Sequence, residues 1–249
     1  MTELKQIYQS LFQHPQEFLF LLSGDFKEAE ILPLLETYLG NLPEFVDEIN
    51  REEEVVRAIP KGPLTKAFSI PGILPSDLNL KIQYTYPIAR DDWKAQLNLQ
   101  LMRDVIRTRL WQLRHVKKRG LYLIQAIAYT DVDLQRGNFA IMLPTVAGME
   151  NSLIKDMQEL VSWFKEHPIS ENELKTIKSR FYIMGITGKS ILDKGYRYYK
   201  WDLQLPDPEV VKAYLEGISP RDIQALIQEK LVPEHRYIFM GKGIPEVSN

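Results

Sequence analysis

The sequence predicts an α+β fold in which a mixed or antiparallel sheet is covered by helices on one face. Two observations carry this prediction: strand-like segments gather around one long helix instead of alternating regularly with helices, and the last third of the chain is mostly helical. A regular alternation of strands and helices would instead have indicated a doubly wound parallel sheet. The 249 residues are 45% hydrophobic and 26% charged, a globular composition with enough apolar material for a sizeable core.

The N-terminal region predicts one strand, one helix and a connector. The apolar run at residues 17–23 is too short and too aromatic for a helix core and is typical of a buried strand. Residues 28–39 carry apolar side chains at helical spacing, and Gly40 closes this helix. From residue 43 to residue 63 the chain is polar and interrupted by prolines, which indicates a connector between structural units.

Beyond the connector, the pattern predicts two pairs of strands separated by one long helix. The second strand alternates apolar side chains with polar or small ones, as a half-buried strand does, and it ends at Pro87. The predicted strands are 64–70, 78–86, 121–131 and 138–143, and the long helix is 93–113. Residues 133–137 form a turn that joins the last two strands into a hairpin.

The final third predicts helices with well-marked starts, followed by one strand. An apolar stripe at residues 153–164 indicates the first of these helices. Ser170 with Glu173 has the spacing of a capping box, in which hydroxyl and carboxylate each accept a backbone N–H at the helix start. Ser219 and Asp222 have the same capping-box spacing. Residues 236–240 have the pattern of a short strand.

Two clusters of side chains each allow a binding role or a purely structural one. The aromatic residues between 196 and 201 are interpreted as core rather than as a ligand platform. The cations of the long helix and its exit face only Asp104 in the local sequence; they either bind an extended peptide or complement the helix dipole in solvent. These cations are Arg103, Arg107, Arg109, Arg114, Lys117, Lys118 and Arg119.

Charge and composition exclude several classes of function. The 31 basic and 33 acidic residues give a net charge of 31 − 33 = −2, which does not favour nucleic-acid binding. The absence of cysteine excludes disulfide scaffolds, thiolate metal sites and cysteine nucleophiles. No apolar run approaches the ~20 residues that span a bilayer, so we expect no membrane span, while cytoplasmic and periplasmic locations both stay open.

The sequence contains no catalytic or metal-binding motif. No H-x-x-E-H segment is present, and we expect the four isolated histidines to have surface roles, a zinc site assembled from distant histidines being the disfavoured alternative. Phosphate-binding and serine-hydrolase motifs are also missing. The carboxylate pairs Asp91–Asp92 and Asp131/Asp133 are interpreted as helix-cap and turn residues rather than as general acid–base pairs. We therefore expect no catalytic residue, metal ligand or cofactor in this chain.

Four passages, in order along the chain, resemble the pitrilysin/insulinase-type zinc peptidases. Residues 18–43 are similar to that family's strand–Gly–Asp–helix–"YLG-x-LP" passage. The strand ending at Tyr86, the long helix and the sequence 119–122 then follow in the family's order. Residues 169–178 and 218–224 resemble two helix starts of the same family. The resemblance covers nearly the whole chain and implies the α+β fold of the pitrilysin-type metallopeptidase domain.

In that family the zinc motif lies in the N-terminal half, so the resemblance implies a C-terminal, zinc-less portion. It implies that residues 1–45 end a preceding domain, 46–60 form a linker and 61–249 form an inactive-type peptidase domain. The implied partners are a zinc-bearing N-terminal half or subunit and a peptide substrate. A homo-oligomer is also compatible, because one strand and one helix cannot bury the apolar side chains of residues 18–35 alone.

The resemblance also implies a substrate-binding pair, Arg114 and Tyr122. In the family, an arginine at the end of the long helix and a tyrosine on the next strand hold the substrate backbone near the scissile bond. Here Tyr122 follows Arg114 by eight residues rather than the usual seven, and a helix-end cation with a packed tyrosine is the competing interpretation.

Two functions remain open from the sequence. The leading one is the non-catalytic part of a zinc endopeptidase that helps to enclose and position a peptide. The alternative is a structural or assembly subunit of the same fold, like the inactive processing-peptidase and core-protein relatives, without a role in peptide cleavage.

Overall fold

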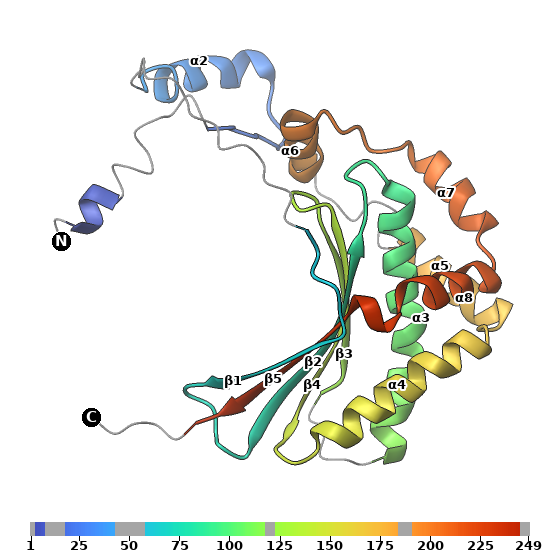
Figure 1. Ribbon diagram of the computed structural model, residues 1–249. Coiled ribbons are helices and arrows are strands. Elements are labelled where there is room, and N and C mark those ends of the chain that lie inside the picture. Colours follow the sequence, from blue (N-terminus) through green and yellow to red (C-terminus); the bar gives the residue numbers. More distant parts are fainter. Residues whose placement is uncertain (1–2, 8–17, 43–57, 118–122, 184–190, 245–249) are drawn as a thin grey trace. The chain divides into compact units, whose positions relative to one another are not determined.

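A computed structural model describes residues 3–7, 18–42, 58–117, 123–183 and 191–244. The chain forms two compact units, one of residues Met1–Glu53 with Gly188–Leu205 and one of Glu54–Thr187 with Pro206–Asn249. Among the described residues, the first unit contains helices α2 (Glu28–Tyr38) and α6 (Ile191–Trp201). The second unit contains the sheet and its helices (Figure 1). The predicted boundaries at residues 45 and 60 stay a prediction.

The second unit is built on a five-stranded mixed sheet with the order β1-β5-β2-β4-β3. β1 and β5 are parallel, and the other neighbouring strands are antiparallel. The strands are β1 (Leu64–Ile70), β2 (Asp77–Pro87), β3 (Gln125–Asp131), β4 (Arg136–Val146) and β5 (Arg236–Gly243). All five predicted strands beyond the connector are confirmed, although β3 begins later than expected and β5 is longer.

Helices lie on one face of this sheet (Figure 1). They are α3 (Trp93–Lys117), α4 (Glu150–Glu166), α5 (Glu171–Ile183), α7 (Pro208–Gly217) and α8 (Pro220–Lys230). α3 packs directly on β3 and β4, α4 contacts β2, and α8 lies against both α3 and α4. A single turn of 3-10 helix, η2 (Pro233–His235), leads from α8 into β5. The predicted α+β class, with helices on one face of a mixed sheet, is confirmed.

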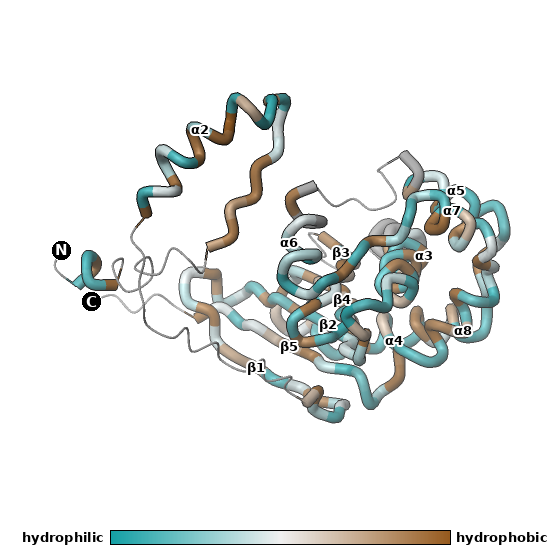
Figure 2. Tube along the Cα trace, turned by 90° about the horizontal axis from the view of Figure 1, so that it is seen from above, coloured by the Kyte–Doolittle hydropathy of each residue, from teal (hydrophilic) through white to brown (hydrophobic). Residues whose placement is uncertain are grey.

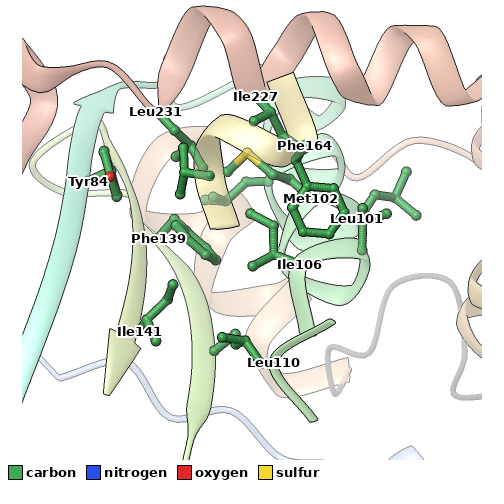
Figure 3. Close-up of a cluster of buried hydrophobic side chains, with 14 of the residues drawn as sticks. Tyr84, Leu101, Met102, Ile106, Leu110, Phe139, Ile141, Phe164, Ile227 and Leu231 are labelled. Carbon is green, nitrogen blue, oxygen red and sulfur yellow. The ribbon is translucent and has the colours of Figure 1, made fainter. Parts of the chain in front are cut away.

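The core lies between the sheet and the helices. Leu78, Leu80, Ile82, Tyr84 and Tyr86 alternate along β2 and are all buried, as the sequence predicts for this strand. The apolar stripe of α4 from Leu153 to Phe164 is also buried. Figure 3 shows how residues of α3, α4 and α8 gather with those of β2 and β4 into one cluster. This continuous core fixes which face of each strand remains for other contacts.

Both predicted capping boxes are present. At the start of α5, the Ser170 backbone N–H donates to Glu173 Oε2 over 3.0 Å, and the Glu173 N–H donates to Ser170 Oγ over 3.2 Å. At the start of α8, Ser219 and Asp222 exchange the same two hydrogen bonds. These local bonds explain why the sequence predicts the starts of α5 and α8 well.

The predicted strand at residues 17–23 is wrong over its described part. Residues 18–23 have no regular secondary structure, and Phe18, Phe20 and Leu22 are exposed. Figure 2 shows a hydrophobic segment leading into α2. A strand requires a neighbouring strand to bond its backbone, and among the described residues no strand lies beside this segment. The apolar pattern therefore indicates that the segment favours burial, but it does not show whether a neighbouring strand is present.

The interpretation of the aromatic cluster at residues 196–201 as core is also wrong. Tyr196, Tyr198 and Tyr199 on α6 are exposed, Tyr199 at 63% of its surface. Tyr196 and Trp201 instead make an edge-to-face contact with ring centroids 5.6 Å apart, and the Lys200 ammonium lies 4.8 Å from the Trp201 ring centroid. The stacking of these side chains on one another replaces burial in a core.

Candidate functional site

The predicted pair Arg114 and Tyr122 falls on residues that the structure does not describe in full. Arg114 belongs to the last turn of α3, and its side chain lies outside the described residues. Tyr122 belongs to the segment 118–122, which also lies outside them. The substrate-binding role of this pair therefore stays a prediction.

One aspartate of each carboxylate pair has the structural role expected of it. Asp92 Oδ1 accepts the Ala95 backbone N–H over 2.9 Å at the start of α3. Asp131 Oδ1 accepts the Leu134 N–H over 2.9 Å in the turn between β3 and β4. The interpretation of these two aspartates as cap and turn residues is confirmed.

The two histidines with described side chains both lie against backbone carbonyls at helix ends. His167 Nδ1 is 3.0 Å from the Trp163 carbonyl oxygen, and His235 Nδ1 is 2.9 Å from that of Lys230. His14 and the side chain of His115 lie outside the described residues. In the described part of the chain, no three His, Cys, Asp or Glu side chains are grouped so as to hold a metal ion.

Part of the basic cluster on α3 is neutralised in the fold. Arg103 pairs with Asp104 over 2.9 Å. Arg109 pairs over 2.9 Å with Glu173 of α5, and its guanidinium lies 5.2 Å from the centroid of the Trp163 ring. Glu173 was not visible as a partner in the local sequence, because it is brought to α3 only by packing of α5. Asp104 is therefore joined by a second acidic partner that is distant in the sequence.

The face of the sheet opposite the helices carries a distinct set of side chains, which we call the open face. Because side chains alternate along a strand, it is formed by the residues between the buried ones of β2 and by their partners in register. Its central residues are Lys66 and Phe68 on β1, Phe239 on β5, Asn79, Lys81 and Gln83 on β2, and Met142 and Pro144 on β4. None of the helices described in the second unit covers this face (Figure 1).

A shallow groove of about 330 Å³ lies on the open face. It is lined by Phe68, Asn79, Leu80, Lys81, Gln83, Met142, Leu143, Pro144 and Phe239. Phe68 is 50% exposed and Met142 36% exposed, so apolar surface is available to another molecule. Gly241 makes room at one wall: a Cβ there would come within 3.1 Å of the Phe68 ring and would overlap the end of Ile70.

A lysine and a rigid polar cluster border this groove. The Lys81 ammonium lies 5.9 Å from the centroid of the Phe239 ring, and partial burial lowers the pKa of this lysine. Beside it, Gln83 Nε2 donates to Thr85 Oγ1 over 2.8 Å and to Asn138 Oδ1 over 2.9 Å, and Thr85 Oγ1 donates to the same Asn138 oxygen. The groove can therefore bind an apolar group next to a negative charge.

Sequence reasoning did not find this groove. The available signal was that apolar residues occupy both alternating sets of positions in β4, Phe139, Ile141 and Leu143 on one face and Met142 and Pro144 on the other. Periodicity assigns the first set to the core and says nothing about the second. The contribution of Phe239 and Phe68 requires the order β1-β5-β2, which joins the two ends of this unit.

None of the described helices is both long enough and apolar enough to cross a membrane. Comparison with curated proteins gave no match.

Three solved structures, which come from two proteases, have the same fold. A protease from Helicobacter pylori is 18% identical with a TM-score of 0.62, covering 88% of this chain and 53% of that one. The periplasmic protease PqqL from Escherichia coli is 13% identical with a TM-score of 0.61, covering 90% of this chain and 25% of that one. The first half of PqqL, 15% identical with a TM-score of 0.62, covers 98% of this chain. This chain thus spans about a quarter to a half of the length of the proteins it resembles.

A family comparison identifies the chain more specifically. The family described as "Peptidase M16 inactive domain" matches residues 1–181, which is most of the sequence. This match agrees with the resemblance to insulinase-type peptidases and with a chain that carries no zinc motif. The chain belongs to the peptidase M16 family, in its inactive-domain group.

Proposed function

We propose that this chain is the C-terminal, non-catalytic portion of a pitrilysin-type zinc endopeptidase, which helps to enclose and position a peptide for a zinc-bearing N-terminal half. The observation that carries the proposal is the open face, with its exposed apolar groove between Phe68 and Met142. A helix layer covers the other side, so the open face is the broad surface that this unit offers to a substrate.

The proposal assigns the chemical step to the partner half. A zinc ion held there would activate the water that attacks the peptide bond. The residues of this chain would bind and orient the peptide, which lowers the entropic cost of reaching a reactive geometry. The share of the relatives' length that this chain spans supports a division of this kind.

The domain division follows from the same proposal. Residues 1–45 would end a preceding domain, 46–60 would link the domains and 61–249 would form the inactive-type domain. Support comes from the exposed apolar side chains at residues 18–22, which need a neighbouring sheet.

Arg114 and Tyr122 are the proposed substrate-binding residues. A guanidinium and a phenol both donate hydrogen bonds to a peptide carbonyl, and they could steady the oxyanion formed during attack by water. Arg114 belongs to the last turn of α3, and Tyr122 comes before β3 in the sequence.

The decisive experiment reunites this chain with the protein that carries an H-x-x-E-H segment in the same or a neighbouring reading frame. We expect the chain alone to bind no zinc and to cleave no peptide, and the mixture to cleave far faster than the zinc-bearing half alone. In the mixture, Arg114→Ala and Tyr122→Phe should reduce turnover without reducing assembly or melting temperature. Arg180→Ala, an exposed arginine of α5 outside the basic cluster, is the matched control.

Two results would contradict the proposal. Stoichiometric zinc with chelator-sensitive activity in the chain alone would show that it is itself a peptidase. A stable complex whose turnover equals that of the zinc-bearing half alone would favour the alternative, a structural or assembly subunit.

A further inference from the structure

On the open face two lysines flank Phe239 in register, and one of them, Lys81, lines the groove. Lys66 of β1, Phe239 of β5 and Lys81 of β2 are paired in register across three neighbouring strands. Met142 of β4 continues the same row beyond Lys81. One row across the sheet thus alternates positive charge with apolar surface.

These two lysines have no acidic partner within the described chain. Neither ammonium forms an ion pair among the described residues, whereas five other lysines of that part do. Lys81 is half-buried against Phe239, and burial lowers its pKa because the charged form loses water without gaining a carboxylate. A carboxylate supplied by a ligand would offset the free-energy cost of this desolvation through a charge-assisted hydrogen bond.

The spacing of these groups matches an extended peptide. Side chains two residues apart in an extended chain lie on the same side, about 7 Å from each other. The Lys81 ammonium lies 5.9 Å from the Phe239 ring, which forms part of the apolar lining. The groove volume of about 330 Å³ suits one or two side chains rather than a folded domain.

We propose that this groove binds peptides in which a bulky apolar residue is followed or preceded, two positions away, by Asp or Glu. The apolar side chain packs between Phe68, Met142 and Phe239, and the carboxylate pairs with Lys81. This inference rests on the proposed function, because it takes the open face to be the surface that binds the substrate peptide.

The test measures peptide binding to the complete chain without a zinc-bearing partner, so that no cleavage is required. The probes are three fluorescein-labelled heptapeptides that differ only at the two positions concerned: Phe-x-Glu, Phe-x-Gln and Ala-x-Glu. By fluorescence anisotropy, we expect Phe-x-Glu to bind about tenfold more tightly than either of the others. Lys81→Met should abolish the preference for Glu over Gln and leave the preference for Phe over Ala.

Two further variants make the result specific. Met142→Trp fills the groove and should weaken binding of both Phe peptides while leaving the melting temperature unchanged, since Met142 lies on the exposed face of β4. Lys175→Met, an exposed lysine of α5 on the helix side, is the matched control and should bind like the unaltered chain.

Several outcomes would overturn the assignment. They are equal affinity for Glu and Gln peptides, no binding of any probe, and a preference that survives Lys81→Met. A homodimer in sedimentation velocity that dissociates in Met142→Trp would show that a second copy covers the groove instead.

The turnover assay separates this inference from the proposed function. If the reunited enzyme cleaves Phe-x-Glu and Phe-x-Gln equally well and the chain alone prefers neither, only the groove assignment fails. If the chain binds Phe-x-Glu selectively but does not stimulate the zinc-bearing half, the enclosing role fails and the peptide site stands.

Discussion

At the scale of single residues, Glu173 connects three parts of the second unit. Its carboxylate accepts the Ser170 backbone N–H at the start of α5 and pairs with Arg109 of α3, which also lies over Trp163 of α4. The Ser170 amide, with the Ser170 hydroxyl and the Arg109 charge adding to it, lowers the pKa of Glu173 below its ordinary value. A capping residue visible in the sequence is therefore also the link between three helices.

The pH dependence of this link can be derived from the sign of the shift. In the unfolded chain a glutamate has a pKa of about 4.3, and in the fold the pKa of Glu173 is lower. Its contribution to stability is therefore fully present above about pH 4.3 and is lost as the pH falls through the folded pKa. We expect Glu173→Gln to lower the melting temperature by ~2–4 °C at pH 7 and by progressively less as the pH falls below about 4.3.

Melting curves of Glu173→Gln between pH 3 and 7 check this expectation. Glu171→Gln, in the same helical turn but outside the capping box, is the control and should differ little from the unaltered chain throughout. A deficit in Glu173→Gln that stays constant down to pH 3 would contradict the argument.

Gly137 permits the close approach of β4 to the end of β2. A Cβ at this position would overlap Ile88 Cδ1 and come within 2.9 Å of Ile88 Cγ1, and Ile88 is itself buried. We expect Gly137→Ala to reduce the free energy of unfolding by about 1–3 kcal/mol through overpacking. Urea denaturation measures the loss.

The matched control is Gly217→Ala at the end of α7. Nothing lies within 4 Å of a Cβ built at Gly217, so this variant should be neutral or slightly more stable. Equal losses in both variants would show that the cost at Gly137 does not come from its neighbours.

At the scale of elements, the sequence predicts those features that depend on short-range spacing. The alternation of β2, the apolar stripe of α4 and the capping boxes of α5 and α8 all arise within a few residues of one another. Strand pairing and side-chain burial that depend on residues distant in the sequence were not predictable. The segment 18–23 has the apolar pattern of a strand, but none of the described strands lies beside it. Tyr196 and Trp201 of α6 contact each other edge to face, and Tyr196 is exposed.

The same limit applies to the candidate site. The groove combines Phe68 from β1 with Phe239 from β5, which are about as far apart in sequence as the strands of this unit allow. No periodicity reports which strands become neighbours. The pair Arg114 and Tyr122 was predicted separately, from the resemblance to a family. The Arg114 side chain and Tyr122 lie outside the described residues, so this pair stays a prediction.

The packing of α4 on the sheet gives a test at this scale. Phe164 is 1% exposed and lies in the cluster of Figure 3, so Phe164→Ala should reduce the free energy of unfolding by about 3–5 kcal/mol. Ser162→Ala, two residues earlier on the exposed side of α4, should change it by less than about 0.5 kcal/mol. Chemical denaturation of both variants compares a core position with a surface position of one helix.

At the scale of the whole molecule, the two units differ in how far they bury their apolar side chains. The second unit encloses a continuous core between sheet and helices. In the first unit α2 has no buried residue, and Phe20 and Leu22 just before it are exposed. The first unit therefore has apolar surface available for contact with another domain.

Hydrogen exchange tests this difference between the units. In the chain alone, we expect the amides of residues 19–23 to exchange rapidly, since these residues form no strand, and those of β2 and β4 to exchange slowly. Joining the zinc-bearing half should slow exchange at residues 19–23 by pairing them with its sheet. Strong protection of residues 19–23 in the chain alone would contradict this account.

The position of β5 between β1 and β2 determines how late in synthesis this part of the sheet can close. β1 and β2 are joined by residues 71–76 but do not pair, because β5 lies between them. The joining segment closes over the end of β5, where the carbonyl oxygens of Ile73 and Leu74 leave no space for a side chain at Gly243. Until β5 has been synthesised, β1 and one edge of β2 have unpaired backbone groups that can pair with other chains. The eight residues of β5, which follow the other four strands in the sequence, therefore decide when these two edges of a nascent sheet cease to be open to aggregation.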